Sequence, residues 1–226
     1  MKKTFYSELS YVFGVIILAF GTALMTAADF GVSMVVAPAY ILHLKISEFL
    51  PFFSFGMAEY TLQAVILVVM MLIVRKFKIS YLFSFVTAVI YGVLLDLSLW
   101  ALSAVPTLLW VRIVFYWVGL VVVSFSVALL FKTYISPEAY ELFVMEISSK
   151  FKLDISKLKI CYDVLSRVIA VILSFSFFGF FVFRGVSWGT VIAAVLNGLV
   201  IKAFSKMLDK NFEFKDRLPL RKIFEK

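Results

Sequence analysis

The sequence predicts an all-α integral membrane protein with six transmembrane helices, arranged as two inverted three-helix repeats in one domain. Two features of composition and one of patterning predict this class: 63% hydrophobic residues, only 16% charged residues, and apolar runs long enough to cross a bilayer. Soluble domains average about 45–50% apolar and about 25% charged residues. The composition therefore excludes a soluble globular protein and a disordered chain.

Six apolar runs between charge clusters each have about the length that a 30 Å hydrocarbon core requires. They are expected near residues 8–29, 57–74, 81–102, 109–131, 160–182 and 188–205. The first run follows Lys2 and Lys3, as the apolar part of a signal peptide would. Its length and the five spans that follow favour an uncleaved first helix.

The distribution of Lys and Arg predicts the orientation, because positively charged loops resist translocation. Most of the 22 Lys and Arg residues lie at the N-terminus, after the second and fourth expected spans, and in residues 206–226. Both termini are therefore expected in the cytoplasm, with residues 1–205 forming the membrane domain and 206–226 a basic cytoplasmic tail. The net charge of +8 indicates this orientation and an attraction to anionic lipid, and not nucleic-acid binding.

Internal similarity predicts that the chain consists of two repeats, residues 8–102 and 109–205. Residues 88–92 (AVIYG) lie 106 positions before residues 194–198 (AVLNG), and each stretch follows a Phe-basic pair, at 77–78 and 183–184. Because each half has three spans, the second half enters the membrane from the opposite side. The repeats are therefore inverted, and a cavity is expected between them.

Several short motifs resemble the YczE/YitT-like family of bacterial multi-pass membrane proteins. The matching residues are 19–24 (AFGTAL), 31–33 (GVS), 92–96 (GVLLD), 136–137 (SP) and 185–190 (GVSWGT). Residues 33–35 (SMV) depart from the Ser-Pro-Trp-like step that this family usually shows after its first span. The resemblance implies a multi-pass protein of the bacterial cytoplasmic membrane. Since family members are mostly uncharacterised and some are labelled permeases by analogy, it supports fold and location more than activity.

Polar residues inside the expected spans are candidate functional residues, since an ionisable group at the bilayer centre costs about 2.5 kcal/mol or more. Asp96 lies deep in the third span, and the repeat places Lys202 at the equivalent position of the sixth. This acid and this base are expected either to pair between the halves or to snorkel from the ends of their spans.

Two further pairs are spaced four residues apart, so that each shares one helical face. Glu59 and Gln63 lie on the second span, and Glu59 has no charged partner in the sequence. It is expected to bind a proton, a cation or a cationic solute, or else to lie at the headgroups. Asp163 and Arg167 lie on the fifth span, where they are expected to pair with each other or to line a vestibule.

The breaks after the first and fourth spans are each expected to hold a short interfacial or re-entrant helix. After the fourth span, Ser136 is expected to cap a helix that begins at Pro137, with Glu138 and Glu141 near its positive end. Its amphipathic pattern favours an interfacial position over a re-entrant one. Residues 33–44 are more apolar and favour a re-entrant segment.

Ala19, Ala23 and Ala27 recur every four residues on one face of the first span. Such a stripe lets helices approach closely, so packing against a neighbouring span is expected. The alternative is a docking face for another subunit, as in the substrate-binding subunits of energy-coupling-factor importers. The inverted repeat argues against that alternative.

These features favour a small-solute permease without its own ATPase, whose site lies between the halves. The expected site residues are Glu59, Gln63, Asp96 and Asn197. Two alternatives stay open: a substrate-binding membrane subunit of a multi-component importer, and a non-transport scaffold or accessory protein. No P-loop is present and Cys161 is the only cysteine, so no catalytic residue, metal or cofactor is assigned and an enzyme is not expected. The expected partners are the lipid bilayer, a small solute and a second copy in a homodimer.

Overall fold

The computed structural model describes residues 2–106, 108–180, 187–218 and 221. Within these ranges the chain forms eight helices and two short strands. In chain order they are β1 (Lys3–Tyr6), α1 (Ser7–Ala28), α2 (Ala37–Ile46), α3 (Phe55–Val74), α4 (Ile79–Leu102), α5 (Leu109–Leu130), α6 (Ala139–Phe151), α7 (Ile155–Phe178), α8 (Trp188–Asn211) and β2 (Phe212–Lys215). The Phe-Arg pair at 183–184 and the first two residues of the motif at 185–190 lie outside the described residues.

Six of these helices are long and apolar enough to cross a membrane: α1, α3, α4, α5, α7 from Lys157, and α8. Large apolar side chains cover their outward faces, and Leu72 on α3 is 71% exposed. Lipid is the solvent in which such surfaces are stable. The prediction of an all-α membrane protein with six spans is confirmed, and the chain is an integral membrane protein.

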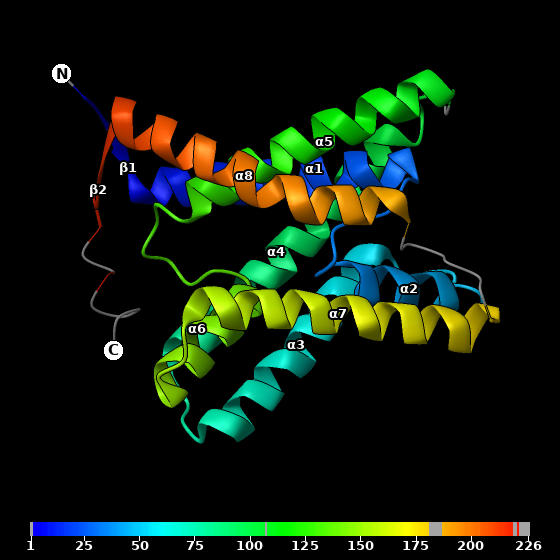
Figure 1. The fold of residues 1–226 in the computed structure, drawn as a ribbon, viewed down its shortest axis with the longest axis horizontal. Helices are drawn as coiled ribbons and strands as arrows, with labels where there is room; N and C mark the ends of the chain where they lie inside the picture. Colours follow the sequence, from blue (N-terminus) through cyan, green and yellow to red (C-terminus); the bar gives the residue numbers. More distant parts are fainter. Residues whose placement is uncertain (1, 107, 181–186, 219–220, 222–226) are drawn as a thin grey trace.

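The helices form two groups, with α4 crossing between them (Figure 1). In one group α1 packs along α5, which also packs on α8. In the other group α3 packs on α2 and α6, and both of these short helices also pack on α7. Helix α4 joins the groups because it contacts both α1 and α3.

The small-residue face of α1 lies in the core of the molecule. Ala19 and Ala23 are fully buried and Ala27 is half-buried. Their neighbours in the core include Phe55 on α3 and Tyr91 on α4. Small side chains on α1 therefore accompany close packing against helices of the same chain.

Helices α3 and α4 meet backbone to backbone at Gly56 and Gly92. A Cβ atom on Gly56 would collide with the carbonyl oxygen of Gly92, so only glycine fits this crossing. The crossing fixes the start of α3 less than one turn before Glu59. On α8, none of the described atoms outside that helix's own backbone lies within 4 Å of the place where a Cβ on Gly198 would stand.

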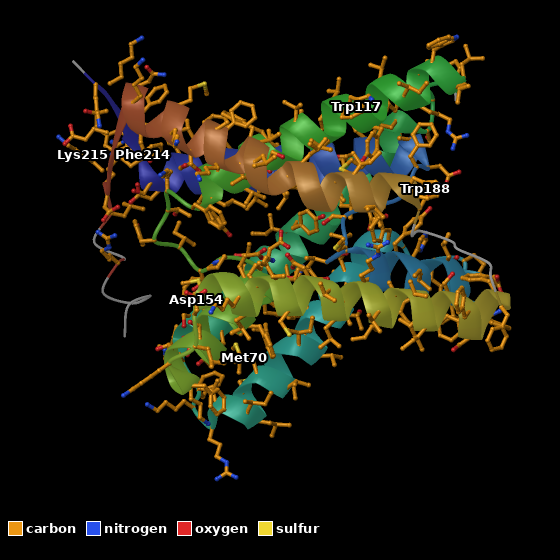
Figure 2. The ribbon with its side chains drawn as sticks, viewed as in Figure 1. Met70, Trp117, Asp154, Trp188, Phe214 and Lys215 are labelled. Atoms are coloured by element: carbon orange, nitrogen blue, oxygen red, sulfur yellow. The ribbon has the colours of Figure 1, made fainter. Side chains whose placement is uncertain are left out.

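The two ends of the chain are tied together, which the sequence did not predict. Strands β1 and β2 pair in parallel. The Glu8 carboxylate accepts hydrogen bonds from the backbone N–H groups of Arg217 and Leu218. Figure 2 shows Trp188 near one end of α8 and Lys215 beyond the other end, beside the N-terminal segment. The N-terminal and C-terminal segments thus lie on the same side of the bundle.

The expected boundary at residue 205 falls inside a helix. Helix α8 continues to Asn211, and the described part of the tail that follows begins as strand β2. Because Lys206 and Lys210 lie on this last helical stretch, these tail charges belong to an extension of the span.

Candidate functional site

The polar centre of the molecule lies where the N-terminus of α6 meets α3. Glu59 and Gln63 project from α3, and both are 0% exposed. Ser54 begins this helix, since its hydroxyl oxygen accepts a hydrogen bond from the Met57 N–H at 3.1 Å. The spacing of four residues puts Glu59 and Gln63 on one face, and the structure directs that face inward.

Three groups at the start of α6 face this pair: the Glu138 carboxyl, the Ala139 N–H and the Tyr140 hydroxyl. The Ala139 N–H donates to Gln63 Oε1 at 3.1 Å, and the Tyr140 hydroxyl donates to Glu59 Oε2 at 2.8 Å. The first N–H groups of a helix have no partner inside the helix. A side chain on α3 therefore supplies the partner that Ala139 needs.

Gln63 joins the two acids. Its Nε2 atom lies 3.4 Å from Glu59 Oε2 and 3.3 Å from Glu138 Oε2. A side-chain amide has two N–H donors and one carbonyl acceptor. Its nitrogen faces both acids, and its carbonyl accepts from the Ala139 N–H. We call Glu59 and Glu138 the acid pair, and these two residues with Gln63 and Tyr140 the polar centre.

Each member of the acid pair keeps one oxygen that no described group contacts by a hydrogen bond. These atoms are Glu59 Oε1 and Glu138 Oε1, and both are buried. Buried polar atoms are nearly always paired, and an unpaired one costs about 1–3 kcal/mol. Both oxygens can accept a hydrogen bond or coordinate a cation, so the acid pair can bind a ligand.

Hydroxyl groups on α4 hold the chain segment that carries Glu138. The Ser84 hydroxyl donates to the Pro137 carbonyl at 2.6 Å, and the Thr87 hydroxyl lies 3.4 Å from the Ser136 carbonyl. These bonds hold residues 136 and 137 before the start of the helix, so the prediction that Ser136 caps a helix starting at Pro137 is wrong. The helix begins at Ala139, and Glu138 is 6% exposed and points inward.

Further hydroxyls surround the polar centre on the side of α1 and α4. The Tyr91 hydroxyl donates to Thr22 Oγ1 at 3.1 Å. The Tyr11 hydroxyl and Thr87 Oγ1 lie 2.7 Å apart. These side chains connect α1 with α4 and bring neutral polar groups near the acid pair.

Burial raises the pKa of Glu138 well above its usual range, and the carboxylates of Glu141 and Glu59 raise it further. The hydrogen bond from Gln63 and the charge of Lys159 act in the opposite direction. The net effect is that the neutral, protonated form of Glu138 is favoured.

A set of charged side chains lies between α6 and α7, next to the polar centre. Lys159 Nζ lies 3.3 Å from Glu141 Oε1 and 3.1 Å from Asp163 Oδ1. The expected pair of Asp163 with Arg167 is therefore not the one that forms. Lys159 is also four residues from Asp163, and it faces α6, where it neutralises a second carboxylate.

Asp96, Asn197 and Lys202 do not join the polar centre. Asp96 accepts hydrogen bonds from the Ser54 hydroxyl and from the Gly56 N–H, so its charge stabilises the positive N-terminus of α3. Asn197 Oδ1 accepts from the Ser124 hydroxyl at 3.0 Å, between α8 and α5. Lys202 is exposed and is not the partner of Asp96 in the part of the chain described.

Sequence reasoning found half of the polar centre. Glu59 and Gln63 stood out as a polar pair inside an apolar run. Glu138 and Tyr140 were missed because the pattern around them predicted an interfacial helix with Glu138 in its solvated first turn. A carboxylate directly after Pro137, in the break that follows the fourth span, was the available signal, but nothing in the sequence indicated that Gln63 faces it.

Residues 5–206 match a family that is described as "Family of unknown function (DUF6198)". The chain belongs to this family. The matched part holds the whole polar centre and the charged groups of α6 and α7, and it ends before β2. No curated protein and no solved structure matches the chain.

Proposed function

We propose that this DUF6198 protein is a small-solute permease without its own ATPase, and that the polar centre is its transport site. The acid pair carries the proposal: two carboxyl groups are buried between α3 and α6, and each has an oxygen free to accept from a ligand. Ionisable groups inside a membrane bundle mark ion and substrate pathways.

Inverted repeats are the second part of the proposal. If the halves are repeats, α1, α2, α3 and α4 correspond to α5, α6, α7 and α8 in that order. The contact of α1 with α4 then corresponds to the contact of α5 with α8. In the same way, the contact of α6 with α3 corresponds to the contact of α2 with α7. The packing of α3 on α4 has no counterpart between α7 and α8 in the described residues. The contacts that do correspond support two halves, each with a short helix after its first span. The polar centre then lies between the halves, where rocking exposes a site to one side of the membrane at a time.

We further propose that the protein lies in the bacterial cytoplasmic membrane with both termini in the cytoplasm, and that it is related to YczE/YitT-like proteins. The Lys and Arg distribution supports this orientation. The pairing of β1 with β2 supports an even number of crossings, because it holds the two terminal segments on one side.

The transport site is tested by a thermal-shift screen of the detergent-purified chain against a library of metabolites and cations. A ligand at 100 times its Kd adds about 2.7 kcal/mol to the free energy of unfolding. We expect a stabilising solute whose effect is lost in Glu59→Gln and Glu138→Gln and kept in Asn197→Ala. The same solute should then enter proteoliposomes that contain the wild-type protein.

Other outcomes point to other classes of protein. A solute that binds but enters vesicles only when a copurified ATPase is present would identify a binding subunit of a larger importer. Equal melting temperatures of all variants with every compound, and a normal cell phenotype of the Glu59 and Glu138 variants, would indicate a scaffold.

A further inference from the structure

We propose that the acid pair carries a proton, and that Glu141 on α6 is the residue through which it exchanges that proton with water. This inference rests on the proposed function, because it names the coupling ligand of the same site and the route by which the ligand arrives.

The first step is the charge of the acid pair. Both carboxyl groups lie within hydrogen-bond distance of one nitrogen, Gln63 Nε2, so they are neighbours. Two adjacent carboxylates in a medium of low dielectric constant cannot both stay ionised. A proton held by the pair removes one charge and needs no further space.

The second step is the set of groups that face the acid pair from each packed element. Electrostatic interactions link its members to tyrosines on α1, α4, α6 and α7 and to two charged residues at the α6–α7 contact. The tyrosines are neutral donors. Lys159 is a cation that acts on Glu138, and it already pairs with two other carboxylates. The groups concerned are Tyr11, Tyr91, Tyr140, Glu141, Lys159 and Tyr162.

The third step is that apolar side chains close the way along α3 in both directions. On one side of Glu59 the core contains Phe55 and Ala58, which pack with residues of α1, α2 and α4. On the other side it contains Leu67 and Met70, which pack with residues of α4 and α6. The ionisable side chains buried in these clusters are tyrosines, Tyr91 in the first and Tyr81 in the second, and neither cluster contains a carboxyl or amino group.

The fourth step is the charged contact between α6 and α7. Glu141 lies three residues after Glu138 in the chain, in the first turn of α6, and its carboxylate acts electrostatically on Glu138. Its side chain is 31% exposed, whereas Glu138 is 6% exposed. Lys159 Nζ, on α7, lies 3.3 Å from Glu141 Oε1, and the Lys159 side chain is 33% exposed. Glu141 therefore lies at the surface of the molecule and within electrostatic range of the acid pair.

The proton transfer involves only hydronium, Glu141 and the acid pair. The Glu141 carboxylate takes a proton from hydronium, forming one O–H bond as water is released. It then gives that proton to the acid pair and returns to its ion pair with Lys159. Release follows the same steps in reverse, and no oxidant, reductant or further reactant takes part.

The test uses infrared spectroscopy of the full chain in lipid, which separates protonated from ionised carboxyl groups. We expect a protonated carboxyl band near neutral pH that disappears in the double variant Glu59→Gln, Glu138→Gln. After transfer to D2O this band shifts as deuterium replaces the carboxyl proton. We expect the rate of that shift to be at least tenfold lower in Glu141→Gln than in the wild type. Glu141→Asp should recover part of the rate, because a shorter carboxylate still carries a proton.

The matched control is Glu146→Gln on the same helix, whose carboxylate pairs with Lys78 and Tyr81 away from the acid pair. It should exchange at the wild-type rate. Equal rates in Glu141→Gln and wild type, or slowing by Tyr11→Phe instead, would overturn the route. A band that the double variant keeps would overturn the proton assignment. If the proton assignment fails but a solute still binds at the polar centre, the permease proposal stands. If the proton band and its exchange behave as expected but no solute has any effect, the permease proposal is refuted and the proton site stands.

Discussion

Two short helices dock on membrane spans in this molecule, α6 on α3 and α2 on α7, and among the described residues only the first junction buries carboxyl groups. We call it the polar junction. The second, which we call the apolar junction, contains a cluster with Ala37 and Ile41 of α2 against Ala170 of α7, all 0% exposed. The first buries Glu59 and Glu138 in the same kind of setting. Docking a short helix therefore needs no acid. Since replacing buried ionic groups by apolar ones is often neutral or stabilising, the acids of the first junction indicate a chemical role.

The junctions also differ in how they treat the helix N-terminus. At α2, Val36 occupies the cap position without a side-chain hydrogen bond. At α6, the Ala139 N–H, which has no partner within its own helix, donates to the Gln63 side chain on α3. The polar junction thus fixes the position of α6 relative to α3, and with it the distance between the two acids.

The largest effect is expected from moving α3, which carries half of the polar junction. In Gly56→Leu the new side chain collides with the Gly92 carbonyl, and we expect a loss of about 3 kcal/mol or more in the free energy of unfolding. Gly198→Leu, on the open face of α8, should change it by about 0.5 kcal/mol or less. Denaturant titration of the purified protein measures both. Similar losses in the two variants would contradict the close crossing.

The next largest effect is expected from replacing Gln63, whose side chain bridges the two acids and the Ala139 N–H at the polar junction. Gln63→Leu leaves the Ala139 N–H and both carboxyl groups without their shared partner, so we expect a loss of about 2–3 kcal/mol. At the apolar junction, Ile41→Val removes one methyl group and should cost about 1 kcal/mol. Unfolding curves of the two variants compare the junctions directly. A Gln63 variant as stable as the Ile41 variant would show that the bridge does not hold α6.

A pH series sharpens the comparison further. Glu138 has a raised pKa in the folded state, so the folded protein holds its proton more tightly than the unfolded chain does. The resulting stability is present below the ordinary Glu pKa of about 4.5 and is lost as pH rises toward the raised value, by up to about 1.4 kcal/mol per pH unit. Melting temperature should therefore fall with rising pH in the wild type and fall less steeply in Glu138→Gln. Parallel pH profiles would refute the burial of a protonated Glu138.

The smallest effect is expected far from both junctions. Asn197→Ala leaves the Ser124 hydroxyl without its acceptor, and we expect a loss of about 1 kcal/mol. Binding of any solute found in the ligand screen should be unchanged, because Asn197 does not reach the polar centre. A measured loss of binding would return Asn197 to the site.

The spans could be predicted because their signal is local. Each apolar run must be about 20 residues long to cross a bilayer, and six runs of that kind became six helices. Glu59 and Gln63 were visible for the same reason, as polar residues four apart in such a run. Helix α8 runs past the expected boundary at residue 205 because Lys206 and Lys210 have high helix propensity, so charge alone does not end a helix.

Pairings between distant segments could not be predicted. Glu138 meets Gln63 across a sequence separation of 75 residues, and no local pattern encodes that contact. The same holds for Asp96, whose partners are the backbone and the cap residue of another helix. Lys159 was overlooked because Arg167 offered an equally spaced partner for Asp163 on the same helix. Tertiary packing decided between the two.

Uptake of the solute found in the ligand screen into proteoliposomes tests the role of the polar junction most directly. We expect uptake by the wild type and by Asp96→Asn, which alters only the contact of Asp96 with the start of α3. Glu59→Gln and Glu138→Gln should each reduce the initial rate at least tenfold while keeping a folded, monodisperse protein. Uptake at the wild-type rate by both of these variants would contradict the assignment of the acid pair as the transport site.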